Sequence, residues 1–213
     1  MQALERVNSN DYWVTIVLVC LLIAVFFLKL LDAKKLKGYA FSMFSRGFIE
    51  DEIEENIGFF NSFQILISFF SGIVISLLVY NLLSIYGNNF DEGFYSFCIV
   101  FLLISIFFLI KRFLEYALTL LFNIKKPLRF YLVSKFSYLF AICFLLFFGL
   151  VLVAYAHINI VFLVYSSIAL FAIRFVLHVF NNKKLIFSKL FYFILYFCAF
   201  EIAPLLILFK LMF

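Results

Sequence analysis

Six long apolar runs divide this chain, and each is bounded by charged or turn-forming residues. A bilayer core of roughly 30 Å requires about 20 mostly apolar residues per helical span, and these runs are near that length. A transmembrane strand would instead alternate apolar and polar residues over about ten positions. The sequence therefore predicts an all-α membrane protein, a bundle of about six transmembrane helices. The predicted spans are 12–31, 63–86, 94–110, 136–155, 158–180 and 187–212.

The composition supports this assignment. Hydrophobic residues make up 67% of the 213 residues, and phenylalanine alone accounts for 35 of them. A water-soluble surface cannot accommodate so many apolar side chains, so we expect a single integral membrane domain over residues 1–213. The first run is long and lacks a basic flank, so we expect it to remain as a helix rather than to be cleaved as a signal peptide.

Lysines and arginines of the loops are found on alternate sides of the predicted spans. They follow the first, third and fifth spans, whereas the loops after the second and fourth spans contain none. Because cytoplasmic loops are enriched in these residues, we expect the basic side to face the cytoplasm and both termini to face away from it. We expect this side to contact anionic membrane lipids and not nucleic acid. The basic loop residues are Lys34, Lys35, Lys37, Arg46, Lys111, Arg112, Lys125, Lys126, Arg129, Lys135, Lys183, Lys184 and Lys189.

The first basic segment mixes aromatic and acidic residues. Phe41, Phe44 and Phe48 recur at helical spacing, which predicts an amphipathic cytoplasmic helix at about 39–50 that lies in the membrane interface. An acidic cluster comes next, and it is either a solvated helix face or a docking patch for a basic segment of a partner. The cluster consists of Glu50, Asp51, Glu52, Glu54 and Glu55.

The second basic segment follows the third span. Its pattern is helical up to about Asn123, and Pro127 indicates a break before the fourth span. Arg112 and Glu115 are three residues apart, so we expect them to pair on one helix face. An apolar face continues beyond the membrane boundary, so the third helix either runs on along the bundle or bends into the interface.

Sequence motifs for catalysis, metal binding or cofactor binding are missing. The four cysteines are isolated from one another, and the two histidines are too dispersed for a zinc site. There is no glycine-rich phosphate loop, no GxSxG elbow and no HExxH pair. A membrane enzyme acting on lipids would need clustered acids or histidines, and only residues 50–55 offer such a cluster. We therefore expect no metal, no cofactor and no enzymatic activity.

One carboxylate lies deep in a predicted span. At 1.5 Å per residue, Glu201 is roughly 16 Å from the outer end of the last span, close to mid-membrane. Pro204 removes a helical hydrogen bond and frees the backbone carbonyl of Phe200 beside it. A buried charge is costly in a bilayer. Glu201 is therefore either neutral and hydrogen-bonded at this kink, or part of an ion path with Arg174 of the fifth span.

Three segments carry a family resemblance. They are KRFLEYALTLLFN, YLVSKFSYLFAICFLLF and the carboxyl-terminal LFYFILYFCAFEIAPLLILFKLMF. With these segments the chain resembles an integral membrane family of Bacteroidota called domain of unknown function 4271, from about the second span onward. The resemblance implies a multi-pass protein of a bacterial inner membrane, whose termini are then periplasmic, and it implies no particular activity.

Two functions remain for such a protein. The first is a non-enzymatic subunit or scaffold of a larger cell-envelope complex, such as export or motility machinery, that binds other integral membrane proteins through aromatic helix surfaces. The second is a small proton-coupled or ion-coupled transporter that uses Glu201 and Arg174. The first is favoured, because no second acid lies deep in another predicted span and no internal repeat relates the two halves of the chain.

The predicted orientation can be tested by cysteine labelling in intact cells with a membrane-impermeant reagent. A cysteine at Asn89 is expected to be labelled from outside, because its loop carries no cation, whereas a cysteine at Asn182 in a basic loop is expected to be protected. Labelling of the Asn89 position from the cytoplasmic side alone would reverse the assignment.

The role of Glu201 can be tested by two substitutions. Glu201→Gln is expected to be nearly harmless, because an amide has the same size and still donates a hydrogen bond. Glu201→Leu is expected to destabilise the bundle by about 1 to 2 kcal/mol, as for one lost intramembrane hydrogen bond. Activity in cells is compared with the amount of folded protein. Loss of activity in Glu201→Gln at normal abundance would favour the transporter instead.

Overall fold

The structure, a computed structural model, describes residues 12–42, 48, 62–86, 93–122, 125–156 and 158–181, with the backbone alone at 86, 114–122, 125–132 and 178–181. These residues form six helices and no strand, which confirms the all-α fold class. Five of the helices are long and apolar enough to cross a membrane. The predicted span at 187–212 lies outside the described residues.

The five spanning helices occupy the positions of the first five predicted spans. A short helix, α2, follows the first of them, and α5 and α6 are longer than the predicted spans 94–110 and 136–155. The helices are α1 (Tyr12–Leu31), α2 (Ala33–Ala40), α4 (Ser62–Tyr86), α5 (Phe94–Phe122), α6 (Lys125–Ala156) and α7 (Ile160–Asn181).

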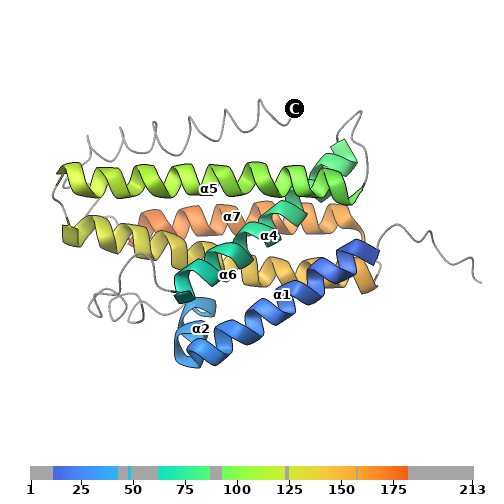
Figure 1. Cartoon of the computed structure of the whole chain (residues 1–213), viewed down its shortest axis with the longest axis horizontal. Coiled ribbons are helices and arrows are strands. Elements are labelled where there is room, and N and C mark those ends of the chain that lie inside the picture. Colours follow the sequence, from blue (N-terminus) through green and yellow to red (C-terminus); the bar gives the residue numbers. More distant parts are fainter. Residues whose placement is uncertain are drawn as a thin grey trace, which may run out of the picture.

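Successive spanning helices run in alternate directions through the bundle (Figure 1). One end of the bundle is therefore formed where α1 ends, α4 begins, α5 ends, α6 begins and α7 ends. We call it the basic end, because the lysines and arginines of the described loops and helix ends lie there, and it carries α2. Which side of the membrane it faces stays a prediction. Its basic residues are Lys29, Lys34, Lys35, Lys37, Lys111, Arg112, Lys125, Lys126, Arg129 and Lys135.

Helix α4 is the most enclosed of the five spanning helices. In its most apolar stretch 56% of the residues are buried, against 17% in α5 and in α7, and α4 contacts α1, α5, α6 and α7. Phe70, Val74 and Leu77 of α4 are almost completely buried, and they belong to the same core as Phe140 and Leu146 of α6. A helix that is enclosed by other helices, as α4 is, can be hydrophobic on every side.

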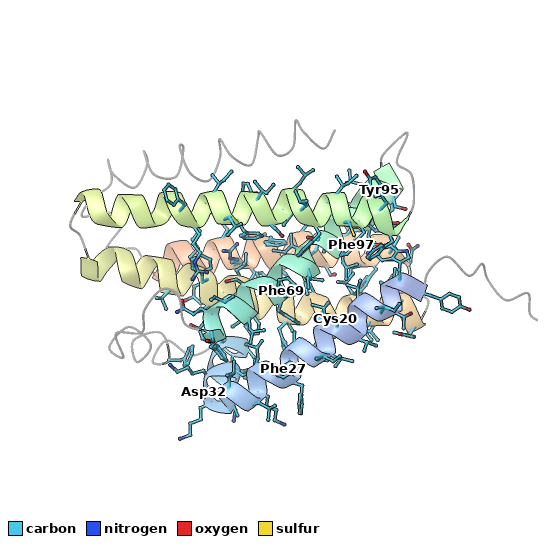
Figure 2. The ribbon with its side chains drawn as sticks, in the orientation of Figure 1. Cys20, Phe27, Asp32, Phe69, Tyr95 and Phe97 are labelled. Atoms are coloured by element: carbon cyan, nitrogen blue, oxygen red, sulfur yellow. The ribbon has the colours of Figure 1, made fainter. Side chains whose placement is uncertain are left out.

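The junction of α1 and α2 is capped by an aspartate. The Asp32 carboxylate accepts a hydrogen bond of 2.9 Å from the backbone N–H of Lys35, and this is the side-chain cap that starts a helix. At the other end of α2, Tyr39 is only 4% exposed and its ring packs against Phe63 and Phe140. Figure 2 shows Asp32 at this corner of the molecule. The cap and the buried tyrosine together set the position of α2.

Most of the amphipathic helix expected at about 39–50 lies outside the described residues. The expectation is wrong at 41–42, where the chain turns after α2 ends at Ala40, whereas residue 48 is helical. Phe41 is 57% exposed, whereas the ring of Phe48 packs on Tyr39 and comes so close to Gly38 that a Cβ there would collide with it. Because the chain turns at 41–42, Phe41 and Phe48 do not lie on one continuous helix face.

Helices α5 and α6 have 29 and 32 residues, more than the roughly 20 that a span requires. Helix α5 runs without a break from Phe94 to Phe122, so the third helix continues past Arg112 rather than bending away. Helix α6 begins at Lys125, before Pro127. The expected break at Pro127 is thus misplaced, because a proline in the first turn of a helix has no intrahelical hydrogen bond to lose.

Two glycines of the spans provide a matched test of helix packing. A Cβ on Gly149 of α6 would lie 2.6 Å from Leu163 Cδ1 of α7, whereas a Cβ on Gly72 of α4 would have no neighbour within 4 Å. Both alanine variants gain helix propensity, but only Gly149→Ala must displace a buried leucine. We expect Gly149→Ala to be less stable than Gly72→Ala by about 1 kcal/mol, measured by unfolding in detergent. Equal stability of the two variants would contradict this packing.

Candidate functional site

Arg112 is held by three helices at the basic end of the bundle. Its Nη1 donates to the hydroxyl of Ser68 at 2.9 Å, and its Nη2 donates to the side-chain carbonyl of Gln64 at 3.3 Å. The guanidinium carbon lies 5.0 Å from the ring centroid of Phe136. The charge is thus anchored to α4 by hydrogen bonds and to α6 by a cation–π contact. We call Arg112, Gln64, Ser68 and Phe136 the arginine site.

The sequence of α4 explains how the arginine site forms. Gln64 and Ser68 are four residues apart and so lie on one face of the helix, one turn from each other. The Ser68 hydroxyl donates to the Gln64 backbone carbonyl at 2.7 Å and accepts from Arg112, so its donor and an acceptor position are both used. Both residues are half-buried.

The predicted partner of Arg112 was Glu115 on its own helix. The structure shows the guanidinium bonded across to α4. The side chain of Glu115 is outside the described part, so its pairing with Arg112 stays a prediction. Sequence reasoning did not select Gln64 and Ser68. The available signal was a polar pair at i and i+4 at the start of an otherwise apolar span.

Lys111, the neighbour of Arg112, takes a different direction. Its ammonium nitrogen lies 5.7 Å from the ring centroid of Phe107, one turn back on the same helix. Consecutive helical residues are separated by about 100° around the axis. The two side chains therefore leave α5 in different directions, and that of Arg112 reaches α4.

Arg174 of α7 lies against α6. Its Nη2 donates to the backbone carbonyl of Lys135 at 3.1 Å, and Lys135 itself is 7% exposed. Arg174 was predicted to be a site residue together with Glu201 and Pro204, but both of those residues lie outside the described part of the chain. What the structure shows for Arg174 is a link between two helices.

The predicted acidic docking patch cannot be placed in the structure. The acidic cluster of Glu50, Asp51, Glu52, Glu54 and Glu55 lies outside the described residues. Among the side chains that are described, no three of the types His, Cys, Asp and Glu are grouped closely enough to hold a metal ion.

Hydroxyl groups within the spans are satisfied by their own helices. The hydroxyls of Ser71, Ser76 and Ser137 each donate to the carbonyl four residues earlier, at 2.7 to 2.9 Å. Ser166 and Ser167 donate to carbonyls three residues earlier. In a bilayer such local bonds remove the cost of a polar group. The hydroxyls of these serines are therefore bonded within their own helices.

Aromatic rings gather at the opposite end of the bundle. Trp13 of α1 packs against Tyr80 and Phe97 with ring centroids 5.1 and 5.2 Å apart, and the Tyr80 hydroxyl accepts a hydrogen bond from the backbone N–H of Gly93 at 3.1 Å. Figure 2 shows Tyr95 and Phe97 near this end of α5. Amphipathic rings at a membrane boundary are common anchors.

The comparisons with known proteins identify one family. A family model described as Domain of unknown function (DUF4271) matches residues 14–212. The chain belongs to this family. The match confirms the resemblance and extends it to α1. No curated protein and no solved structure matches the chain.

Two serines of α4 provide a test of the arginine site in this DUF4271 protein. Ser68→Ala removes an acceptor from the Arg112 charge, whereas Ser76→Ala removes only a bond within the helix. We expect Ser68→Ala to lower the free energy of unfolding by about 1 to 2 kcal/mol, and Ser76→Ala by less than about 0.5 kcal/mol. Unfolding in mild detergent measures both. Equal losses of stability in the two variants would show that the hydrogen bond between Arg112 and Ser68 does not stabilise the fold.

Proposed function

We propose that this DUF4271 protein is a non-enzymatic membrane subunit or scaffold of a larger cell-envelope complex. The observation that carries the proposal is the length of α5 and α6, 29 and 32 residues, which exceeds the roughly 20 residues that cross a bilayer core. We call residues 114–122 and 125–132 the α5–α6 projection. In Figure 1 it extends past the ends of α4 and α2.

The length of the α5–α6 projection supports a tip outside the lipid. From Arg112, whose charge favours the edge of the hydrocarbon, to Phe122 the helix rises about 15 Å, which exceeds the roughly 5 to 8 Å that head groups occupy on one side of a bilayer. Helices that only cross the membrane do not need this extra length. A projection of this kind supplies a surface for another protein.

The charge of the α5–α6 projection favours an acidic partner. Lys125, Lys126 and Arg129 lie in the first turns of α6, and Glu115 is the one acidic residue in the projection's sequence. Basic residues at a helix N-terminus are unfavourable toward the helix dipole, so they add nothing to the stability of α6 itself. Opposite charges guide association with a partner. We propose that this partner belongs to export or motility machinery of the cell envelope.

The described interior also favours a scaffold over a transporter. Core positions of α4 and α6 are filled by large apolar side chains, and Ser71, Ser76 and Ser137 are bonded to their own helices. A proton or ion path needs a series of polar groups directed into a common space. Arg174, the described member of the proposed ion path, bonds to a backbone carbonyl.

The scaffold proposal can be tested by charge reversal at the α5–α6 projection. The double variant Lys125→Glu/Lys126→Glu is expected to lose the protein that cross-links to the wild-type chain in cells, while its abundance in the membrane stays normal. Reversal replaces attraction by repulsion at the contact. Quantitative mass spectrometry after purification in mild detergent measures the co-purified protein.

The matched control is Lys34→Glu/Lys37→Glu, which reverses two exposed lysines of α2 at the same end of the bundle. It is expected to retain the partner. If both double variants keep the same co-purified proteins, or if both lose them equally, the α5–α6 projection is not the docking surface.

A further inference from the structure

The corner where α1 meets α2 exposes charged and apolar side chains together. Three lysines and three large apolar residues are exposed there, and we call this group the α2 corner. Water suits the ammonium groups but not the apolar side chains, and a hydrocarbon core suits only the apolar ones. The α2 corner is separate from the α5–α6 projection, so what it binds goes beyond the proposed scaffold. Its members are Lys29, Leu30, Leu31, Lys34, Lys37 and Phe41.

Helix α2 has one face toward the bundle and one face away from it. Tyr39 is 4% exposed, and Leu36 packs against the core. Lys34 and Lys37 are exposed instead, and they are three residues apart, which places them on one side of the helix. Phe41, the C-cap residue, is 57% exposed and follows Lys37 by four positions. The outward face therefore carries two cations followed by an aromatic ring.

The position of α2 along the bundle follows from the length of α1. Helix α1 has 20 residues, which at 1.5 Å each span about 30 Å, the thickness of a hydrocarbon core. Asp32 is the one residue between α1 and α2, and its carboxylate caps α2. In Figure 1 α2 lies at the level where α1 ends and α4 begins. The α2 corner is thus at the boundary between acyl chains and head groups.

A lipid leaflet satisfies both kinds of side chain at this boundary. Leu30 and Leu31 end the span and are 65% and 52% exposed, so acyl chains are suitable neighbours for them. Lysine lays its methylene stem along apolar surface and extends its ammonium group toward the head groups. A protein segment that paired with the lysines would also have to cover the apolar side chains, whereas lipid surrounds them without further structure.

We propose that the α2 corner binds the head groups of anionic phospholipids, with Lys34 and Lys37 at the head groups and Phe41 among the upper acyl chains. Interfacial helices that combine basic and aromatic residues bind anionic membranes in this way. A zwitterionic lipid offers the same phosphate without a net charge, so the proposal requires a preference for the anionic lipid. The other candidate occupant is an acidic segment of a partner protein.

The experiment places a fluorescent reporter at position 41 of the full chain. Trp13 is the single tryptophan, so Trp13→Phe/Phe41→Trp carries its one tryptophan in the α2 corner. Both changes are conservative, because position 41 is exposed and position 13 keeps a ring. This reporter chain is reconstituted in phosphatidylcholine bilayers with a small, fixed fraction of phosphatidylglycerol or phosphatidylcholine that is brominated on its upper acyl chains. Bromine quenches tryptophan fluorescence on contact.

We expect both brominated lipids to quench the reporter chain, and phosphatidylglycerol to associate about fivefold or more tightly than phosphatidylcholine. This ratio corresponds to the attraction of at least one lysine near the membrane surface. Adding Lys34→Gln/Lys37→Gln is expected to lower the ratio below about twofold, because the apolar contacts remain and two charges are lost.

Lys125→Gln/Lys126→Gln is the matched control, because it removes two charges at the same end of the bundle, from the α5–α6 projection. It is expected to keep the ratio of the reporter chain. The control also separates the two proposals, since loss of a docked protein after charge reversal at Lys125 and Lys126 does not require any change in lipid preference.

Three results would overturn the proposal. One is the absence of quenching by either brominated lipid, which would leave the α2 corner to water or to an acidic segment of a partner. Another is equal association of the two lipids with the reporter chain. The third is a ratio that Lys34→Gln/Lys37→Gln leaves unchanged, or that both glutamine variants lower equally. Folding of each variant is followed by helical circular dichroism. If Lys34→Gln/Lys37→Gln does not fold, a ratio in the reporter chain that stays constant from about 0.05 to about 1 M salt has the same meaning as the third result.

Discussion

Within a bilayer, every backbone and side-chain polar group must find its partner inside the protein, and α4 is where this constraint is met most fully. It is the helix with the largest buried share, and it touches α1, α5, α6 and α7. Its serines bond to its own carbonyls, which allows small polar residues to lie in the packed centre. The other spanning helices are therefore arranged around α4, with their apolar faces turned to lipid.

The same helix connects the core to the site. Gln64 and Ser68 lie at the start of α4, at the basic end, and face Arg112 at the end of the α5 span. A guanidinium at this depth would otherwise extend toward water along the surface of the helix. Because α4 offers two acceptors, the guanidinium stays at the junction of α4, α5 and α6.

The lengths of the apolar runs were enough to predict much of the fold. Five described helices occupy predicted spans, because a stretch of about 20 apolar residues has few structural alternatives in a membrane. Errors arose in the short segments at the membrane surface. A helix capped by Asp32 ends at Ala40 and the chain turns at 41–42, where the spacing of the phenylalanines had predicted helix.

The sequence by itself determined that this chain is a helical membrane protein of the DUF4271 family and which loops are basic. Those properties follow from composition and from residues close together along the chain. Only the tertiary structure decided that α4 is central, that helix α5 continues to Phe122, and that Arg112 bonds to α4. Each of these depends on contacts between residues far apart in sequence, such as Arg112 and Ser68, whose helices meet only when the whole bundle packs.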